Sequence, residues 1–172
     1  MLRPISTAIV FAAILAACSP TFNWREVRVQ PAGMKALMPC KPESETRVVP
    51  MAGRDVDLVV LGCETGGATF ALLFADLGNG GRANEVLGQW KKATLANLRG
   101  VAAREVPFRP PGALALPASQ QAVVVGQRAD GSKVESHAAY FAHRTHVFQA
   151  VIYSGTLKPE VAETFFSGIS FE

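Results

Sequence analysis

The sequence lacks a strong excess of charge of either sign. It holds 17 Lys and Arg residues against 14 Asp and Glu residues, a formal net charge of +3 at pH 7. Removal of residues 1–17 takes away Arg3, so 16 basic residues then face 14 acidic ones and the net charge is +2. Binding to phosphate groups needs a clustered basic face. No such cluster occurs along the chain, so we expect no nucleic-acid partner.

The sequence also lacks, at its N-terminus, an apolar run long enough for a permanent membrane span, which needs about 20 residues. The run over residues 5–17 is interrupted by Ser6 and Thr7 and follows the short charged start Met-Leu-Arg-Pro. A charged start followed by a short apolar run is typical of a secretory signal peptide. The sequence therefore predicts an exported protein.

The end of that run, Leu15-Ala16-Ala17-Cys18, resembles the lipobox of bacterial lipoproteins. The resemblance implies cleavage between Ala17 and Cys18 and acylation of Cys18 with two or three chains, which anchors a protein stably in a lipid membrane. Lipoproteins kept at the inner membrane carry Asp at the next position, so Ser19 favours the outer membrane, on its periplasmic face. The alternative is an ordinary secretory signal followed by a chance cysteine.

The length of 172 residues fits one domain after the signal peptide is removed. We expect a lipoprotein signal peptide over residues 1–17, a lipidated cysteine with a short tether over residues 18–23, and a single domain over residues 24–172. This places the domain in the bacterial cell envelope, close to its membrane.

Cysteine is scarce, with three residues in the chain. If Cys18 carries lipid, Cys40 and Cys63 remain, and a cysteine pair in an exported protein predicts a disulfide. The alternatives are two free buried thiols or half of a metal site. The two cysteines are not a Cys-x-x-Cys pair, which argues against a thiol oxidoreductase.

Strand patterns dominate the chain, and two segments have a helical period instead. Val56, Leu58 and Val60 alternate with Asp55 and Asp57, as in a half-buried strand. Turn residues at Gly66-Gly67 and Asp130-Gly131 predict antiparallel hairpins. The expected strands are 24–29, 35–38, 46–51, 56–63, 68–76, 122–128, 134–142 and 147–153, and the expected helices are 82–98 and one that begins near Pro159.

Strands in runs with two helices predict an α+β fold, an antiparallel sheet covered by the two helices. The segments Pro39-Cys40-Lys41-Pro42, Phe74-Ala75-Asp76-Leu77, Val147-Phe148-Gln149-Ala150-Val151 and Phe165-Phe166-Ser167-Gly168, in this order, resemble a group of small exported bacterial proteins. Their shape is similar to the Mog/PsbP-like α+β fold. The resemblance covers about residues 35–171 and rests on packing and turn residues. Better-known relatives bind or assemble other proteins, which implies a binding role by analogy alone.

The sequence lacks the motifs of the common catalytic sites. Ser119, Ser136, Ser154 and Ser167 are available, but none stands in a Gly-x-Ser-x-Gly elbow or a Ser-x-x-Lys pair. The glycine-rich segment 78–81 is not followed by the parallel strand and acidic residue of a dinucleotide site, so we expect a plain turn and no cofactor. These absences favour a protein that is not an enzyme.

Histidine is also scarce, and His137, His143 and His146 all lie in or beside one expected hairpin. The favoured interpretation is solvated histidines and no metal, because Arg144 stands between two of them and the catalytic zinc helix motif is absent. The alternative is an envelope hydrolase or a metal-dependent enzyme that uses the 137–146 hairpin.

The proline-rich segment 107–117 carries Leu114 and Leu116, apolar residues in a loop. They either pack under the loop or form a patch that binds a partner. The sequence as a whole predicts a membrane-anchored envelope lipoprotein that binds another envelope protein or a small envelope ligand.

Overall fold

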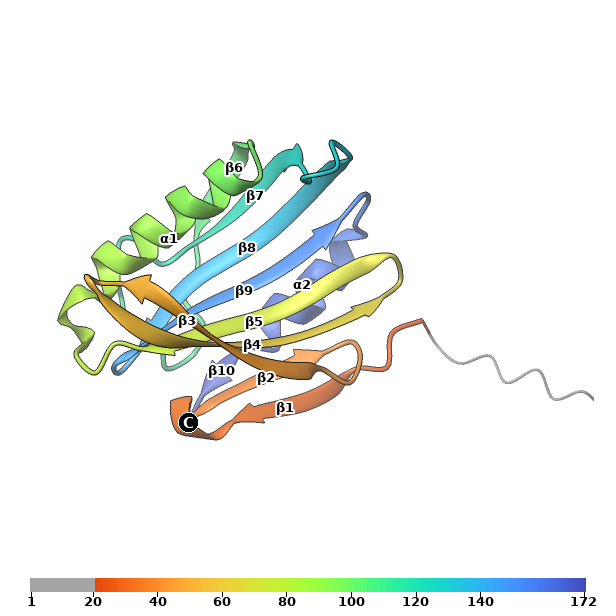
Figure 1. Ribbon diagram of the computed structural model, residues 1–172. Helices are drawn as coiled ribbons and strands as arrows, with labels where there is room; N and C mark the ends of the chain where they lie inside the picture. Colours follow the sequence, from red (N-terminus) through yellow and green to blue (C-terminus); the bar gives the residue numbers. More distant parts are fainter. Residues whose placement is uncertain (1–20) are drawn as a thin grey trace, which may run out of the picture.

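The computed structural model describes residues 21–172, which form a seven-stranded antiparallel sheet and a separate three-stranded sheet (Figure 1). The expected signal peptide over residues 1–17 and the expected lipidation site Cys18 lie outside the described residues. The large sheet has the order β3-β4-β5-β9-β8-β7-β6. Its strands are β3 (Glu43–Met51), β4 (Arg54–Thr65), β5 (Ala68–Asp76), β6 (Val101–Pro107), β7 (Gln120–Gln127), β8 (Lys133–His143) and β9 (His146–Ser154).

The small sheet pairs β1 (Arg25–Val29) with β2 (Met34–Met38), and β2 also pairs with the short C-terminal β10 (Ser170–Phe171). The helices are α1 (Ala83–Asn97) and α2 (Pro159–Ser167), with short 3-10 turns η1 (Gln30–Ala32) and η2 (Gly80–Arg82). All eight expected strands and both expected helices are therefore present. The sequence missed β6 and β10.

Most strand pairs of the large sheet are local hairpins, as the turn residues predicted. The pairing of β5 with β9 is the exception, since it joins segments about 70 residues apart and sets Phe74 opposite Phe148. This pairing places β9 in the middle of the sheet. A residue of β9 can then contact either layer that covers the sheet.

Each face of the large sheet carries its own core. The first core joins β5, β8 and β9 to α2 and the small sheet, and includes Phe70, Phe141, Phe148, Phe165 and Met34. The second core joins the opposite face to α1, and includes Leu58, Tyr140, Val151, Val86 and Leu87. Alternation along β5 explains the separation, because Phe70, Leu72 and Phe74 face the first core while Ala71 and Ala75 face the second.

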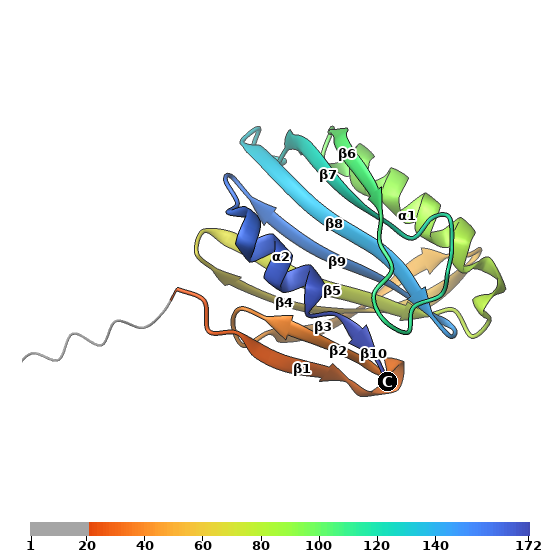
Figure 2. The ribbon, with the colours of Figure 1, turned by 180° about the vertical axis from the view of Figure 1, so that it is seen from behind.

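The expected architecture, an antiparallel sheet covered by two helices as in the Mog/PsbP-like fold, is wrong. The protein is mostly β, and the small sheet lies beside α2 on the face away from α1 (Figure 2). The physical reason is the area of the sheet face that has to be covered. A nine-residue α2 cannot cover seven strands, and Met34, Ala36 and Met38 give β2 an apolar face that completes the layer.

A buried polar network fixes α1 on its face of the sheet. Gln149 Nε2 donates to Thr94 Oγ1 at 3.2 Å and to the Tyr140 hydroxyl at 3.1 Å. Burial raises the pKa of Tyr140 to about 12, so its hydroxyl stays protonated at neutral pH. Because these groups satisfy each other only in one position of the helix, the network sets the place of α1 on the sheet.

The predicted disulfide between Cys40 and Cys63 is confirmed. Cys40 lies in the connection between the small sheet and β3, and Cys63 lies in β4, so the bond ties the small sheet to the large one. Closure of a loop with a sequence separation of 23 stabilises a fold by about 3 kcal/mol in the chain-entropy model. In the part of the chain that the structure describes, no helix is long and apolar enough to cross a membrane.

Candidate functional site

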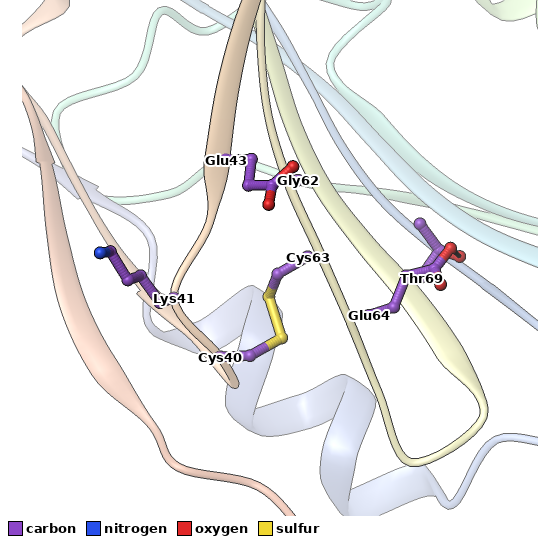
Figure 3. Close-up of a pocket in the computed structure, with 7 residues that line it drawn as sticks. All are labelled: Cys40, Lys41, Glu43, Gly62, Cys63, Glu64 and Thr69. Carbon is purple, nitrogen blue, oxygen red and sulfur yellow. Dashed lines mark hydrogen bonds between the residues drawn. A yellow bond between two sulfur atoms is a disulfide. The ribbon is translucent and has the colours of Figure 1, made fainter.

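The disulfide forms part of a shallow polar depression of about 530 Å³ (Figure 3). Its other lining side chains include Lys41, Glu43, Glu64 and Thr69, and Thr69 Oγ1 donates to Glu64 Oε1 at 3.2 Å. Lys41, Glu43 and Glu64 are exposed to solvent. Exposed ions of both signs in high dielectric interact weakly. We assign this depression a structural role, in keeping with the disulfide.

The three histidines are not brought together. His143 and His146 are cross-strand neighbours beside the turn, whereas His137 lies six residues back along β8, about 20 Å away. His137 Nε2 instead pairs with Glu135 Oε1. Among residues 21–172, no group of three or more His, Cys, Asp or Glu residues is arranged to hold a metal ion.

The expectation of solvated histidines is wrong for His143, which is 9% exposed. Its Nδ1 is hydrogen-bonded to the Gly112 carbonyl at 2.8 Å, and its ring stacks on Phe171 with centroids 4.3 Å apart. It therefore joins the proline-rich loop to the C-terminal strand. His146 is half-buried, and this burial lowers its pKa, while the neighbouring carboxylate of Asp76 acts in the opposite direction.

The four candidate serines do not form a nucleophile. Ser119, Ser136 and Ser154 are buried. Ser167 is exposed at the end of α2, where its hydroxyl donates to the Thr164 carbonyl at 3.5 Å. A nucleophile needs both access to a substrate and a base within hydrogen-bond reach. We find that combination at none of the four positions.

Leu114 and Leu116 are half-buried and pack against the second core. The Leu114 amide donates to the Ala142 carbonyl at 2.8 Å, and the Ala118 amide donates to Asn84 Oδ1 at 2.9 Å. The loop is thereby fixed to β8 and α1. The two leucines thus serve packing, and they do not form a protruding apolar patch.

An apolar groove that the sequence did not indicate lies between α1 and the strands β3 and β4. We name it the Trp90 groove. It has a volume of about 260 Å³ and is lined by Val49, Pro50, Met51, Leu58, Val86, Gln89, Trp90 and Ala93. Trp90 is half-buried and Ala93 is exposed, although both belong to the apolar stripe of α1. This stripe is therefore wider than the part of the sheet that it covers.

The Trp90 groove runs beside a free strand edge. Among the described strands, β3 has a neighbour on one side only, and most of its nine residues are exposed. Val49 pairs with Val56 and so faces the same side of the sheet, toward α1. Alternation of Val49 and Met51 could have indicated this face from the sequence, but only the tertiary structure places α1 against these two residues.

Comparison of the sequence with models of known protein families and with curated proteins finds no match.

Proposed function

We propose that the protein is a membrane-anchored bacterial lipoprotein with a non-enzymatic binding role in the cell envelope. The Trp90 groove binds an extended apolar segment of another envelope protein. The observation that carries this proposal is the pairing of an apolar groove with a free strand edge. The same segment can hydrogen-bond to that edge and place a side chain in the groove.

Strand addition at a sheet edge combines two sources of binding energy. Main-chain hydrogen bonds supply affinity, and pockets for alternate side chains supply specificity. The edge of β3 offers main-chain groups, and Met51, Leu58 and Trp90 offer the pocket. Pro50 has no N–H and so limits the pairing to the residues before it. The partner segment is therefore short.

The lipobox-like Leu15-Ala16-Ala17-Cys18 supports the envelope address, and the disulfide is the bond expected of an exported chain. Expression of the full-length protein with labelled palmitate tests the anchor. Wild type should be labelled and should fractionate with membranes, and the Cys18→Ala variant should lose the label. A labelled variant, or a cleaved and freely soluble wild type, would refute the anchor.

Site-specific photocrosslinking in living cells tests the groove. A crosslinking amino acid at Ala93, on the rim of the groove, should give a defined adduct with another envelope protein. The matched control is Lys92, the exposed neighbour of Ala93 on the polar side of α1. Equal crosslinking at positions 92 and 93, or none at 93, would contradict the proposed site.

A charge at the same rim provides the second test. Because Ala93 is exposed, Ala93→Asp should lower the free energy of unfolding by about 1 kcal/mol or less, mainly through the lower helix propensity of Asp. It should nevertheless abolish the adduct formed from a crosslinker at Gln89, which also lines the groove. Lys92→Asp serves as the control and should leave the adduct intact.

A further inference from the structure

A second apolar groove lies at the end of the domain where the described chain begins. It has a volume of about 630 Å³, within the range of small-molecule pockets of about 300–1,000 Å³. It is lined by Thr21 and Phe22 from the start of the described chain, by Leu157 from the link before α2, and by Pro159 and Val161 from the first turn of α2. Gly66, Ala68, Thr156 and Lys158 complete the lining. We name it the anchor groove.

The N-terminal wall of the anchor groove is fixed to the domain. Thr65 Oγ1 donates to the Thr21 carbonyl, and the Phe22 ring lies 6.0 Å from that of Trp24 and 6.2 Å from that of Phe70. A Cβ at Gly66 would lie 2.7 Å from Phe22 Cζ, so only glycine lets the turn approach this ring. The domain therefore holds the chain at Thr21.

The remaining tether is short. From Cys18 to Thr21 there are three residue steps, which span about 11 Å at most when fully extended. The polar layer on each side of a bilayer is roughly 5–8 Å thick, the difference between the whole bilayer and its hydrocarbon core. If Cys18 is acylated, the anchor groove lies at the membrane surface or within its polar layer.

The end of the domain that carries the anchor groove is built from turns. The β4–β5 turn, the β7–β8 turn and the link from β9 to α2 gather at the end where Thr21 enters, in both views (Figures 1 and 2). Their exposed charged residues are Arg128, Lys133 and Lys158 against Glu64 and Asp130, and the exposed Glu160 follows Pro159 in the first turn of α2. Three basic and three acidic side chains balance, so apolar contact and not net charge favours the bilayer at this end.

We propose that this end of the domain lies on the bilayer and that the anchor groove takes an acyl chain of a membrane phospholipid. The inference rests on the proposed lipid anchor at Cys18. The walls formed by Phe22 and Leu157 suit an acyl chain, and Trp24, which stacks on Phe22, is of a residue type enriched at the membrane interface. Lys158, exposed on the rim, can extend its ammonium group to a lipid phosphate while its methylene groups stay on apolar surface.

The two tryptophans allow a direct test, because Trp24 lies beside the anchor groove and Trp90 lies in the Trp90 groove. Trp24 stacks on Phe22 beside the anchor groove, and Trp90 lies on α1, against the opposite face of the large sheet. Full-length acylated Trp90→Phe and Trp24→Phe variants are reconstituted into phosphatidylethanolamine–phosphatidylglycerol vesicles with or without bromine on the acyl chains. Because bromine quenches tryptophan only at short range, brominated acyl chains should lower Trp24 emission and leave Trp90 emission nearly unchanged.

A charge at the mouth of the groove gives the matched comparison. Thr156 is exposed there, so Thr156→Glu should fold normally and should remove most of the quenching of Trp24. Thr46→Glu, an equivalent change on the exposed outer strand β3, should leave the quenching intact.

The outcomes separate the two proposals. Absence of palmitate on Cys18 would refute the anchor itself. A labelled protein whose Trp24 is not quenched by brominated phospholipid would overturn the groove assignment alone, including the case in which the chain of Cys18 itself fills the groove. Equal quenching of both tryptophans would also overturn it, since another face would then meet the bilayer.

Discussion

The C-terminus of α1 shows how single residues end a helix in this protein. The Arg99 amide donates to the Ala96 carbonyl at 3.1 Å, and the Gly100 amide donates to the Leu95 carbonyl at 3.0 Å. These are the two bonds of a Schellman motif, in which the residue after the cap adopts the left-handed conformation. That residue is Arg99, with a φ of 45°. Gly100 comes one position later, after the left-handed residue.

Arg99→Gly should therefore stabilise the protein. Glycine adopts a positive φ without the Cβ clash that arginine suffers, and the expected gain in the free energy of unfolding is about 1 kcal/mol. Urea unfolding of the two proteins measures it. Gly100→Ala is the control and should lower stability, because its Cβ would lie 2.5 Å from Val124 Cγ1. An unchanged or lowered midpoint for Arg99→Gly would contradict the assignment of strain.

His143 is a second single residue whose replacement should change the stability of the fold. His143→Ala removes the hydrogen bond to the Gly112 carbonyl and the stacking on Phe171, and should lower the free energy of unfolding by about 1–3 kcal/mol. His137→Ala should cost about 1 kcal/mol or less, since its pair with Glu135 is partly exposed. Thermal unfolding of both variants compares them. Equal losses would show that His143 does not tie the loop to the C-terminal strand.

At the scale of elements, the disulfide joins two sheets that share few main-chain contacts. Among residues 21–172, the strands of the small sheet pair only with one another, and the small sheet contacts the large sheet through the first core and through the bond from Cys40 to Cys63. Its strands are at most five residues long. Sheets this small have little stability of their own.

Cys40→Ser with Cys63→Ser should lower the free energy of unfolding by about 3 kcal/mol, as expected for the length of the closed loop. Denaturant unfolding of the double variant measures the loss. Hydrogen exchange of β1 and β2 should increase more than that of β8 and β9, because the small sheet is the part that the bond restrains. Uniform exchange through both sheets would contradict this role.

At the scale of the whole molecule, two cores lie on opposite faces of one sheet and share β5, β8 and β9. A residue on one of these strands contacts one core and its neighbour contacts the other. Loss of either core therefore removes the packing from one face of these shared strands. The described domain should unfold as one cooperative unit.

The two tryptophans report on the two cores, Trp24 on the first and Trp90 on the second. For each of the variants Trp90→Phe and Trp24→Phe, the unfolding midpoint from tryptophan emission should equal the midpoint from circular dichroism of the same variant. Coincidence of different probes is the criterion for two-state unfolding. An earlier transition of Trp24 alone would show that the small sheet and α2 unfold separately.

The secondary-structure elements and the disulfide follow from local sequence patterns and residue counts. Period-two patterns placed eight strands, period-3.6 patterns placed both helices, and the cysteine count indicated the disulfide. These features are local or depend on counting residues. The short β10 and the exposed edge strand β6 were missed, because the first is too short and the second has no regular alternation of apolar and polar residues.

The tertiary structure alone decided which layers cover the sheet and where the grooves lie. Periodicity shows that a strand has an apolar face, but any element of sufficient area can cover that face, and here a small sheet shares the task with α2. The histidines show the same limit. Their spacing suggested one hairpin site, whereas the extended rise of β8 separates His137 from His143, and Phe171, from the far end of the chain, buries His143. Both grooves arise where elements distant in sequence fail to close over apolar side chains, which no local pattern records.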